Sequence, residues 1–155
     1  MRSRAPERES AVNGGPGTDI SYQLFIEVTR PVRCRVGQLG VIRFPAGSYV
    51  YTGSARRGLE ARLARHARKA KSLRWHIDYL LATPCVRIVW IERSAVSECR
   101  LNRSVAGVIV APRFGASDCT SGCGSHLMYV GMQFQERALV QDQPSTFTAW
   151  PAGTR

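Results

Sequence analysis

The first apolar segment of the chain has the pattern of a β-strand. Residues 20–28 (ISYQLFIEV) are rich in β-branched and aromatic side chains, which favour strands. Two shorter runs of the same kind follow at 41–44 and 48–52, with the turn signal Pro-Ala-Gly at 45–47 between them. The pattern therefore predicts three strands in the first third of the chain.

The next segment has the spacing of an amphipathic helix. Apolar residues recur every three or four positions across 59–71, as at Leu59, Leu63 and Ala67, which places them on one helix face. A second helix is predicted over 75–81, because the segment IDYLLATP ends in a proline that a helix does not pass.

The remainder of the pattern predicts one more helix between two more strands. Residues 86–91 form an apolar run typical of a buried strand, and 126–130 form another. Between them, Ser94 is a suitable N-cap for a helix that runs to residue 106. Mixed strands and helices in this order predict an α+β fold with a small, mainly antiparallel sheet flanked by helices.

The two ends of the chain lack any such pattern. Residues 1–17 are rich in Arg, Glu, Gly and Pro, and residues 132–155 show no periodicity. Segments of this composition do not bury enough apolar surface to fold. The sequence therefore predicts one folded domain over 18–131 with a tail on each side.

Composition narrows the class of protein. Of 155 residues, 44% are hydrophobic and the net charge is +11, and the commonest partner of a small basic domain is nucleic acid. A solvated basic face is the plainer alternative. Apolar runs long enough to span a membrane are absent, the first ten residues lack a signal sequence, and five irregularly spaced cysteines do not form a secreted disulfide framework. We expect a cytoplasmic protein, free or nucleoid-associated, with no membrane or obligate protein partner.

The positive charge is concentrated in one stretch, where a single acid, Glu60, accompanies eight cations. A ridge of this kind would hold a phosphate backbone without reading its sequence. We expect nucleic acid, with DNA as the first candidate, to bind the seven ridge cations other than Arg62, which are Arg56, Arg57, Arg65, Arg68, Lys69, Lys71 and Arg74.

A distinctive set of polar residues accompanies these elements. Tyr51-Thr52-Gly53 closes the third strand, and Arg62 and then His66 follow one turn apart on the next helix. Tyr22 lies on the first strand, and Glu98 lies on the third helix. Each piece is a weak signal, but the joint order Tyr, Tyr-x-Gly, Arg, His, Glu is fairly specific.

This order resembles that of the GIY-YIG nuclease superfamily, and RWHIDYLL and FGASDC…SHLMYV resemble a compact, poorly characterised branch of it. The resemblance covers nearly all of 18–131. It implies a GIY-YIG fold, with Tyr22, Tyr51, Arg62 and His66 as catalytic residues and Glu98 as the metal ligand. The chain departs from the pattern at Ile20-Ser21-Tyr22, at Thr52, and in a longer segment between the motifs, which we interpret as an inserted hairpin.

The chemistry of these side chains fits phosphodiester hydrolysis. The planar guanidinium of Arg62 suits a phosphate, and His66, four residues later on the same helix face, can bind or protonate a phosphate oxygen. Tyr22 and Tyr51 can hold or deprotonate the attacking water, provided that Arg62 lowers their pKa. Tyr49 points to the same side of its strand as Tyr51 and is expected only to pack.

Glu98 is the expected metal ligand. Mg²⁺ (or Mn²⁺) needs few carboxylates because it keeps several waters and binds substrate phosphates. The alternative is a surface glutamate paired with Arg100 or Arg103, and Asp78 and Asp118 are the reserve carboxylates.

Two other groups have structural readings. His76 is interpreted as a structural histidine. Cys119, Cys123 and His126 offer three zinc ligands, but no fourth is evident and the usual C-x₂-C pair is missing. The sequence therefore does not predict a zinc site.

These residues lead to one hypothesis and one rival. The hypothesis is a metal-dependent endonuclease that cuts phosphodiester bonds, most simply in DNA. The rival is a catalytically weak nucleic-acid-binding module on the same fold, which would bind DNA regardless of metal.

Overall fold

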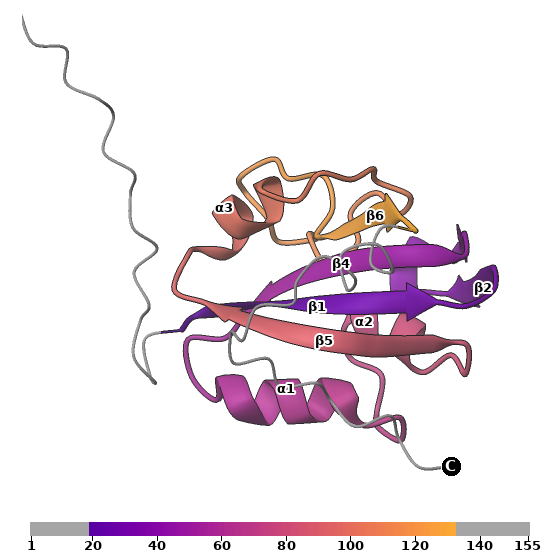
Figure 1. Ribbon diagram of the computed structural model, residues 1–155, viewed down its shortest axis with the longest axis horizontal. Helices are drawn as coiled ribbons and strands as arrows, with labels where there is room; N and C mark the ends of the chain where they lie inside the picture. The colour runs from indigo at the N-terminus through magenta and orange to yellow at the C-terminus, as the bar shows by residue number, and fades with distance from the viewer. Residues whose placement is uncertain (1–18, 133–155) are drawn as a thin grey trace, which may run out of the picture.

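Four antiparallel strands form the main sheet of the structure, a computed structural model that describes residues 19–132 (Figure 1). The sheet order is β5-β1-β4-β6. The strands are β1 (Ser21–Val28), β4 (Gly47–Ser54), β5 (Val86–Ser94) and β6 (Leu127–Gly131). The fold is thus α+β with a small antiparallel sheet, as the pattern predicts. The predicted tails, 1–17 and 132–155, lie outside the described residues apart from Met132.

A separate two-stranded hairpin joins β1 to β4. It consists of β2 (Val32–Arg35) and β3 (Val41–Phe44), with the short 3-10 helix η1 (Gly37–Leu39) between them. The interpretation of this segment as an insertion between the two motif strands is therefore confirmed. The insertion leaves β1 and β4 side by side, paired along their whole length from Ser21–Ser54 to Val28–Gly47.

One face of the sheet carries the main core. Leu24 and Ile26 of β1 are fully buried against helices α1 (Leu59–Ala67) and α2 (His76–Leu81). The opposite face carries a smaller cluster around Phe25, whose ring stacks on Trp90. Alternate residues of each strand thus point to different sides.

Helix α3 (Glu98–Arg103) packs against β4 and β1. Gln23 of β1 ties it to the sheet, since its Nε2 lies 3.2 Å from Thr52 Oγ1 and 3.5 Å from the carbonyl of Leu101. In Figure 1 the helix stands beside β6, away from α1. Within the described residues, no helix is long and apolar enough to cross a membrane.

Helix α1 is shorter than the predicted 59–71. It ends at Ala67, and Arg68 adopts an extended conformation. The Nζ of Lys71 donates to the carbonyls of Arg65 and His66, at 3.1 and 2.9 Å. Those two carbonyls belong to the last turn and would otherwise lack partners, so Lys71 caps the helix instead of extending it.

The third helix is also shorter than predicted. Ser94 is the last residue of β5, where it pairs with Ser21, and its hydroxyl accepts from the amide of Val96 instead of capping a helix. Helix α3 begins at Glu98, after Ser97. The error arises because the strand continues past residue 91, and its consequence is that Glu98 lies in the first helical turn.

Candidate active site

Tyr22, Tyr51 and His66 form a buried cluster between β1, β4 and α1. The ring centroids of Tyr22 and Tyr51 lie 6.5 Å apart, and His66 lies 5.4 and 6.3 Å from them. The hydroxyl of Tyr22 is 2.7 Å from Nε2 of His66. The structure therefore brings together three residues that are far apart in the sequence.

Gly53 makes room for this cluster. A Cβ at this position would lie 2.4 Å from the hydroxyl oxygen of Tyr22, well inside van der Waals contact. Tyr22 pairs with Gly53 across the two strands, so its ring folds over the glycine backbone. The Tyr-x-Gly motif thus has a steric reason here, because the glycine provides the floor on which Tyr22 lies.

The two phenols are not activated as the sequence suggested. Tyr22 is 1% exposed and Tyr51 8%. Burial raises the pKa of both well above the ordinary value, and the opposing charge of Arg62 does not outweigh it. The expectation that Arg62 lowers these pKa values below the ordinary range is therefore wrong, and both phenols are neutral at pH 7.

His66 is also neutral at pH 7. It is 2% exposed, and burial, followed by the positive charge of Lys71, lowers the pKa of its imidazole to about 4. A histidine with that pKa cannot protonate a phosphate at neutral pH, so the expected acid role does not fit this arrangement. Its contact with Tyr22 makes it a residue that orients the phenol.

Arg62 lies at the end of this cluster with its guanidinium held on two sides. Its Nη1 donates to the carbonyl of Ser54, and its guanidinium carbon lies 4.7 Å from the ring centroid of Trp75. A single carbonyl occupies few of the five guanidinium N–H groups, so others remain for a ligand. Arg62 is thus positioned and still able to bind a phosphate.

Glu98 reaches the same residue, Ser54, from the other side. Its Oε2 accepts from the hydroxyl of Ser54 at 2.7 Å, and its Oε1 lies 3.0 Å from Nδ1 of His126. Burial alone would raise the pKa of Glu98, but these two hydrogen bonds lower it below the ordinary value, so the group is ionised at pH 7. The expected alternative partners, Arg100 and Arg103, do not pair with it.

Half of the predicted basic ridge serves the fold. Arg65 makes a two-pronged salt bridge at 2.8 and 3.0 Å to Asp78, which is fully buried. Asp78 also accepts from the amides of Arg74 and Trp75 at the start of α2. Asp78 is therefore structural, which removes it as a reserve metal ligand, and Arg65 is engaged by it.

The two lysines of the ridge are also engaged internally. The Nζ of Lys69 donates to three backbone carbonyls at the end of α2 and the start of β5. Lys71 caps α1, and burial lowers the pKa of its amine to about 8. The assignment of Arg65, Lys69 and Lys71 to nucleic-acid contact therefore needs correction, because these cations neutralise or cap the protein itself. The exposed cations that remain are Arg56, Arg57, Arg68 and Arg74.

The structural readings of Tyr49 and His76 are confirmed. Tyr49 is fully buried, donates to the carbonyl of Pro45 at 2.6 Å and packs on Phe44. The Nδ1 of His76 accepts from the amide of Gly115 at 2.9 Å.

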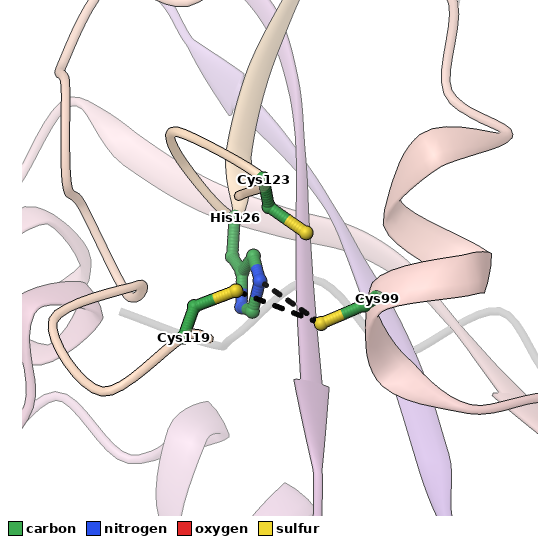
Figure 2. Close-up of side chains that lie close together, drawn as sticks. All are labelled: Cys99, Cys119, Cys123 and His126. Atoms are coloured by element: carbon green, nitrogen blue, oxygen red, sulfur yellow. Dashed lines mark hydrogen bonds between the residues drawn. The ribbon is translucent and has the colours of Figure 1, made fainter. Parts of the chain in front are cut away.

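A second cluster lies next to Glu98. Cys99, Cys119, Cys123 and His126 place their ligand atoms within 4.8 Å of one another (Figure 2). Cys99 comes from α3, the other two cysteines from the following loop, and His126 from the start of β6. Cys99 is the fourth ligand that the sequence did not reveal, because it lies 20 positions before Cys119. Its position directly after Glu98 was the only available clue.

Comparison with known proteins places the chain by sequence alone. A family model described as "Domain of unknown function DUF123" matches residues 21–148. No curated protein and no solved structure matches the chain. The match begins at the first residue of β1 and continues past residue 131, where the sequence pattern predicted the domain to end.

Proposed function

The chain belongs to the DUF123 family, and we propose that it is a metal-dependent endonuclease of the GIY-YIG type that hydrolyses phosphodiester bonds, with DNA as the expected substrate. The observation that carries the proposal is the meeting of Arg62 and Glu98 on Ser54 beside the Tyr22–His66 pair. A fixed cation and a fixed carboxylate next to aligned hydroxyl groups are the components that phosphoryl transfer requires.

Arg62 binds the phosphate in this proposal. The carbonyl of Ser54 and the face of Trp75 fix the guanidinium before any ligand arrives. A cation that is already oriented does not lose further side-chain freedom when the substrate binds. Arg62 can therefore stabilise the charge that grows on the phosphoryl oxygens in the transition state.

The phenols orient the attacking water instead of deprotonating it. Tyr22 is neutral at pH 7 and is held by Nε2 of His66 at 2.7 Å. Tyr51 lies beside it with a ring separation of 6.5 Å. A neutral hydroxyl both donates and accepts, so this pair can align a water or a phosphate oxygen without a change of charge.

Glu98 fits a hard divalent cation. Its carboxylate is ionised, its side chain is 28% exposed, and each oxygen carries one hydrogen bond, so lone pairs remain on both. Mg²⁺ or Mn²⁺ at this position would supply charge stabilisation and a more acidic water. The carboxylate is the hard oxygen ligand that such a cation prefers, and substrate phosphates complete the set.

The burial of the tyrosine pair favours the second candidate, a nucleic-acid-binding module. With Tyr22 and Tyr51 almost fully covered, the four exposed arginines would do all the binding. The two functions differ in their dependence on metal, because cutting needs the cation and electrostatic binding does not.

The test uses the full chain with plasmid, linear and branched DNA and with single-stranded RNA. The nuclease cuts with Mg²⁺ or Mn²⁺, stops when EDTA is added, and resumes when excess Mg²⁺ is restored. A gel shift without cutting under every metal condition would instead support the binding module. Arg62→Ala, prepared in the same way, controls for contaminating nuclease.

A further inference from the structure

The cysteine–histidine cluster supports an inference that does not depend on the nuclease proposal. We propose that Cys99, Cys119, Cys123 and His126 bind one zinc ion, which holds the loop before β6 against α3, and that Glu98 orients the histidine ligand.

The spacing of the ligand atoms is that of a tetrahedral site. The Sγ atoms of Cys99 and Cys119 lie 3.7 Å apart, and Cys99 Sγ lies 3.9 Å from Nε2 of His126. Zinc–sulfur bonds of about 2.3 Å in tetrahedral geometry separate two sulfurs by ~3.8 Å. A disulfide would need about 2.05 Å, and all five cysteines are free thiols in the structure.

The backbone around the cluster turns sharply to bring the ligands together. Gly122 and Gly124, on either side of Cys123, have φ of 71° and 78°, a region that side chains rarely occupy. The amide of Arg113 donates to the carbonyl of Gly124 and closes the base of this turn. These contacts aim Cys123 at the other three ligands, as Figure 2 shows.

The segment that carries these ligands needs a further source of order. Residues 104–126 contain no helix or strand, and one isolated bridge, from Val108 to Tyr129, ties them to β6. A segment this long without regular structure is unusual inside a small domain. A metal that joins its two cysteines to α3 and β6 would compensate, because metal-binding energy becomes folding energy.

Glu98 completes the site from outside. It contacts Nδ1 of His126 at 3.0 Å, on the side of the ring away from the sulfurs. A histidine that binds metal through one nitrogen usually donates from the other to a carboxylate or carbonyl, which fixes the ring. Glu98 is therefore a positioning residue for the zinc site.

Three thiolates and one imidazole select the ion. Soft sulfur ligands favour zinc over Mg²⁺, and four protein ligands close the coordination shell, as in structural zinc sites. The ion proposed here is thus separate from the hard cation of the nuclease proposal.

The test measures bound metal on the full chain, purified without chelators from zinc-supplemented cells. Mass spectrometry for metals should find one zinc per chain. Cys99→Ser and Cys123→Ser should lose it, whereas Cys34→Ser and Cys85→Ser, at cysteines outside the cluster, should keep it. Glu98→Gln should keep zinc but bind it about 10–100-fold more weakly in competition with a chromophoric chelator.

A cobalt titration of the unaltered chain keeps the test decisive if the cysteine variants do not fold. Co²⁺ in this site should give the visible absorption bands of tetrahedral thiolate coordination, and one equivalent of zinc should remove them. Substoichiometric zinc, iron in its place, equal zinc in Cys99→Ser and Cys34→Ser, or absence of the cobalt bands would each overturn the proposal. The nuclease proposal would stand in every one of those cases, because it does not involve these cysteines.

Discussion

Two side-chain clusters meet at Glu98, and they are assembled in different ways. The tyrosine–histidine cluster is carried by paired strands and a helix of the main core, and its members contact one another directly. The cysteine–histidine cluster is carried by a short helix and an irregular loop. Apolar burial is sufficient to position the first cluster, whereas the second has ligands but no core of its own. The first can therefore form with the fold, and the second requires its ion.

Glu98 and Ser54 connect the two clusters. One carboxylate oxygen of Glu98 accepts from Ser54, whose carbonyl binds Arg62, and the other contacts His126. A change at either cluster can thus reach Glu98. The predictions below separate what belongs to each cluster.

The largest effect is expected at Arg62. Arg62→Ala removes the fixed cation, and loss of one preorganised charge-stabilising donor costs about 100–1000-fold in turnover. The fold should persist, since the side chain supplies one hydrogen bond and one cation–π contact. Circular dichroism and single-turnover cutting assays measure the two properties separately.

Arg68→Ala is the matched control, because Arg68 is exposed just beyond the same helix. It should weaken DNA binding slightly and leave turnover intact. Unfolding of Arg62→Ala, or equal loss of turnover in both variants, would show that Arg62 has no specific role in catalysis.

The second effect is a loss of stability in acid caused by His66. Its pKa is about 4 in the folded chain and about 6.5 when unfolded. Between those values the unfolded chain holds the extra proton, so stability falls as the pH drops from about 6.5 to about 4, by roughly 3 kcal/mol. The charged groups that face His66 are Arg62, Arg65, Lys71 and Asp78, and the phenols beside it are Tyr22 and Tyr51.

Urea unfolding at pH 7 and pH 4.5 measures this loss. His66→Gln keeps a hydrogen-bonding group next to Tyr22 but does not titrate, so its stability should change less over the same interval. The difference between the two proteins isolates His66 from the other histidines and the carboxylates. Identical pH dependence in both would mean that His66 is charged in the folded chain.

The smallest effect per residue is expected on the exposed arginines. Replacing Arg56, Arg57, Arg68 and Arg74 by alanine one after another should reduce the salt dependence of DNA binding by about one unit of log–log slope each. Lys69→Met, whose amine donates to three backbone carbonyls in the folded chain, should lower stability and leave that slope unchanged. A slope that falls equally for Lys69→Met would restore the whole predicted ridge as a binding surface.

The sequence predicts the main sheet well, because alternation of apolar residues in 20–28 and the apolar run at 86–91 reflect burial directly. It also predicts which tyrosine packs, since Tyr49 falls outside the Tyr-x-Gly register. Helix ends are predicted less well. Lys71 continues the helical pattern of α1, yet its amine caps the helix from outside, and only the three-dimensional path of the chain shows this.

Two features of the site could not be predicted because they depend on contacts between distant residues. The pairing of Asp78 with Arg65 turns part of an apparent binding surface into a buried salt bridge. Cys99 joins Cys119 only when α3 packs beside the loop before β6. Spacing along the chain shows neither, and the raised pKa of Tyr22 likewise arises from burial that motif order does not reveal.

The most direct test of the account is the effect of Glu98→Gln on DNA cutting, with zinc content and DNA affinity measured on the same preparation. The glutamine keeps the shape of the side chain and can still bond to Ser54 and His126, but it lacks the charge that would hold Mg²⁺. We expect turnover at limiting Mg²⁺ to fall by about two orders of magnitude. One zinc per chain should be retained, and DNA affinity should be equal or higher, because a negative charge has been removed near the phosphate. Cutting at the normal rate at low Mg²⁺ would contradict the account and leave Glu98 only as the partner of His126.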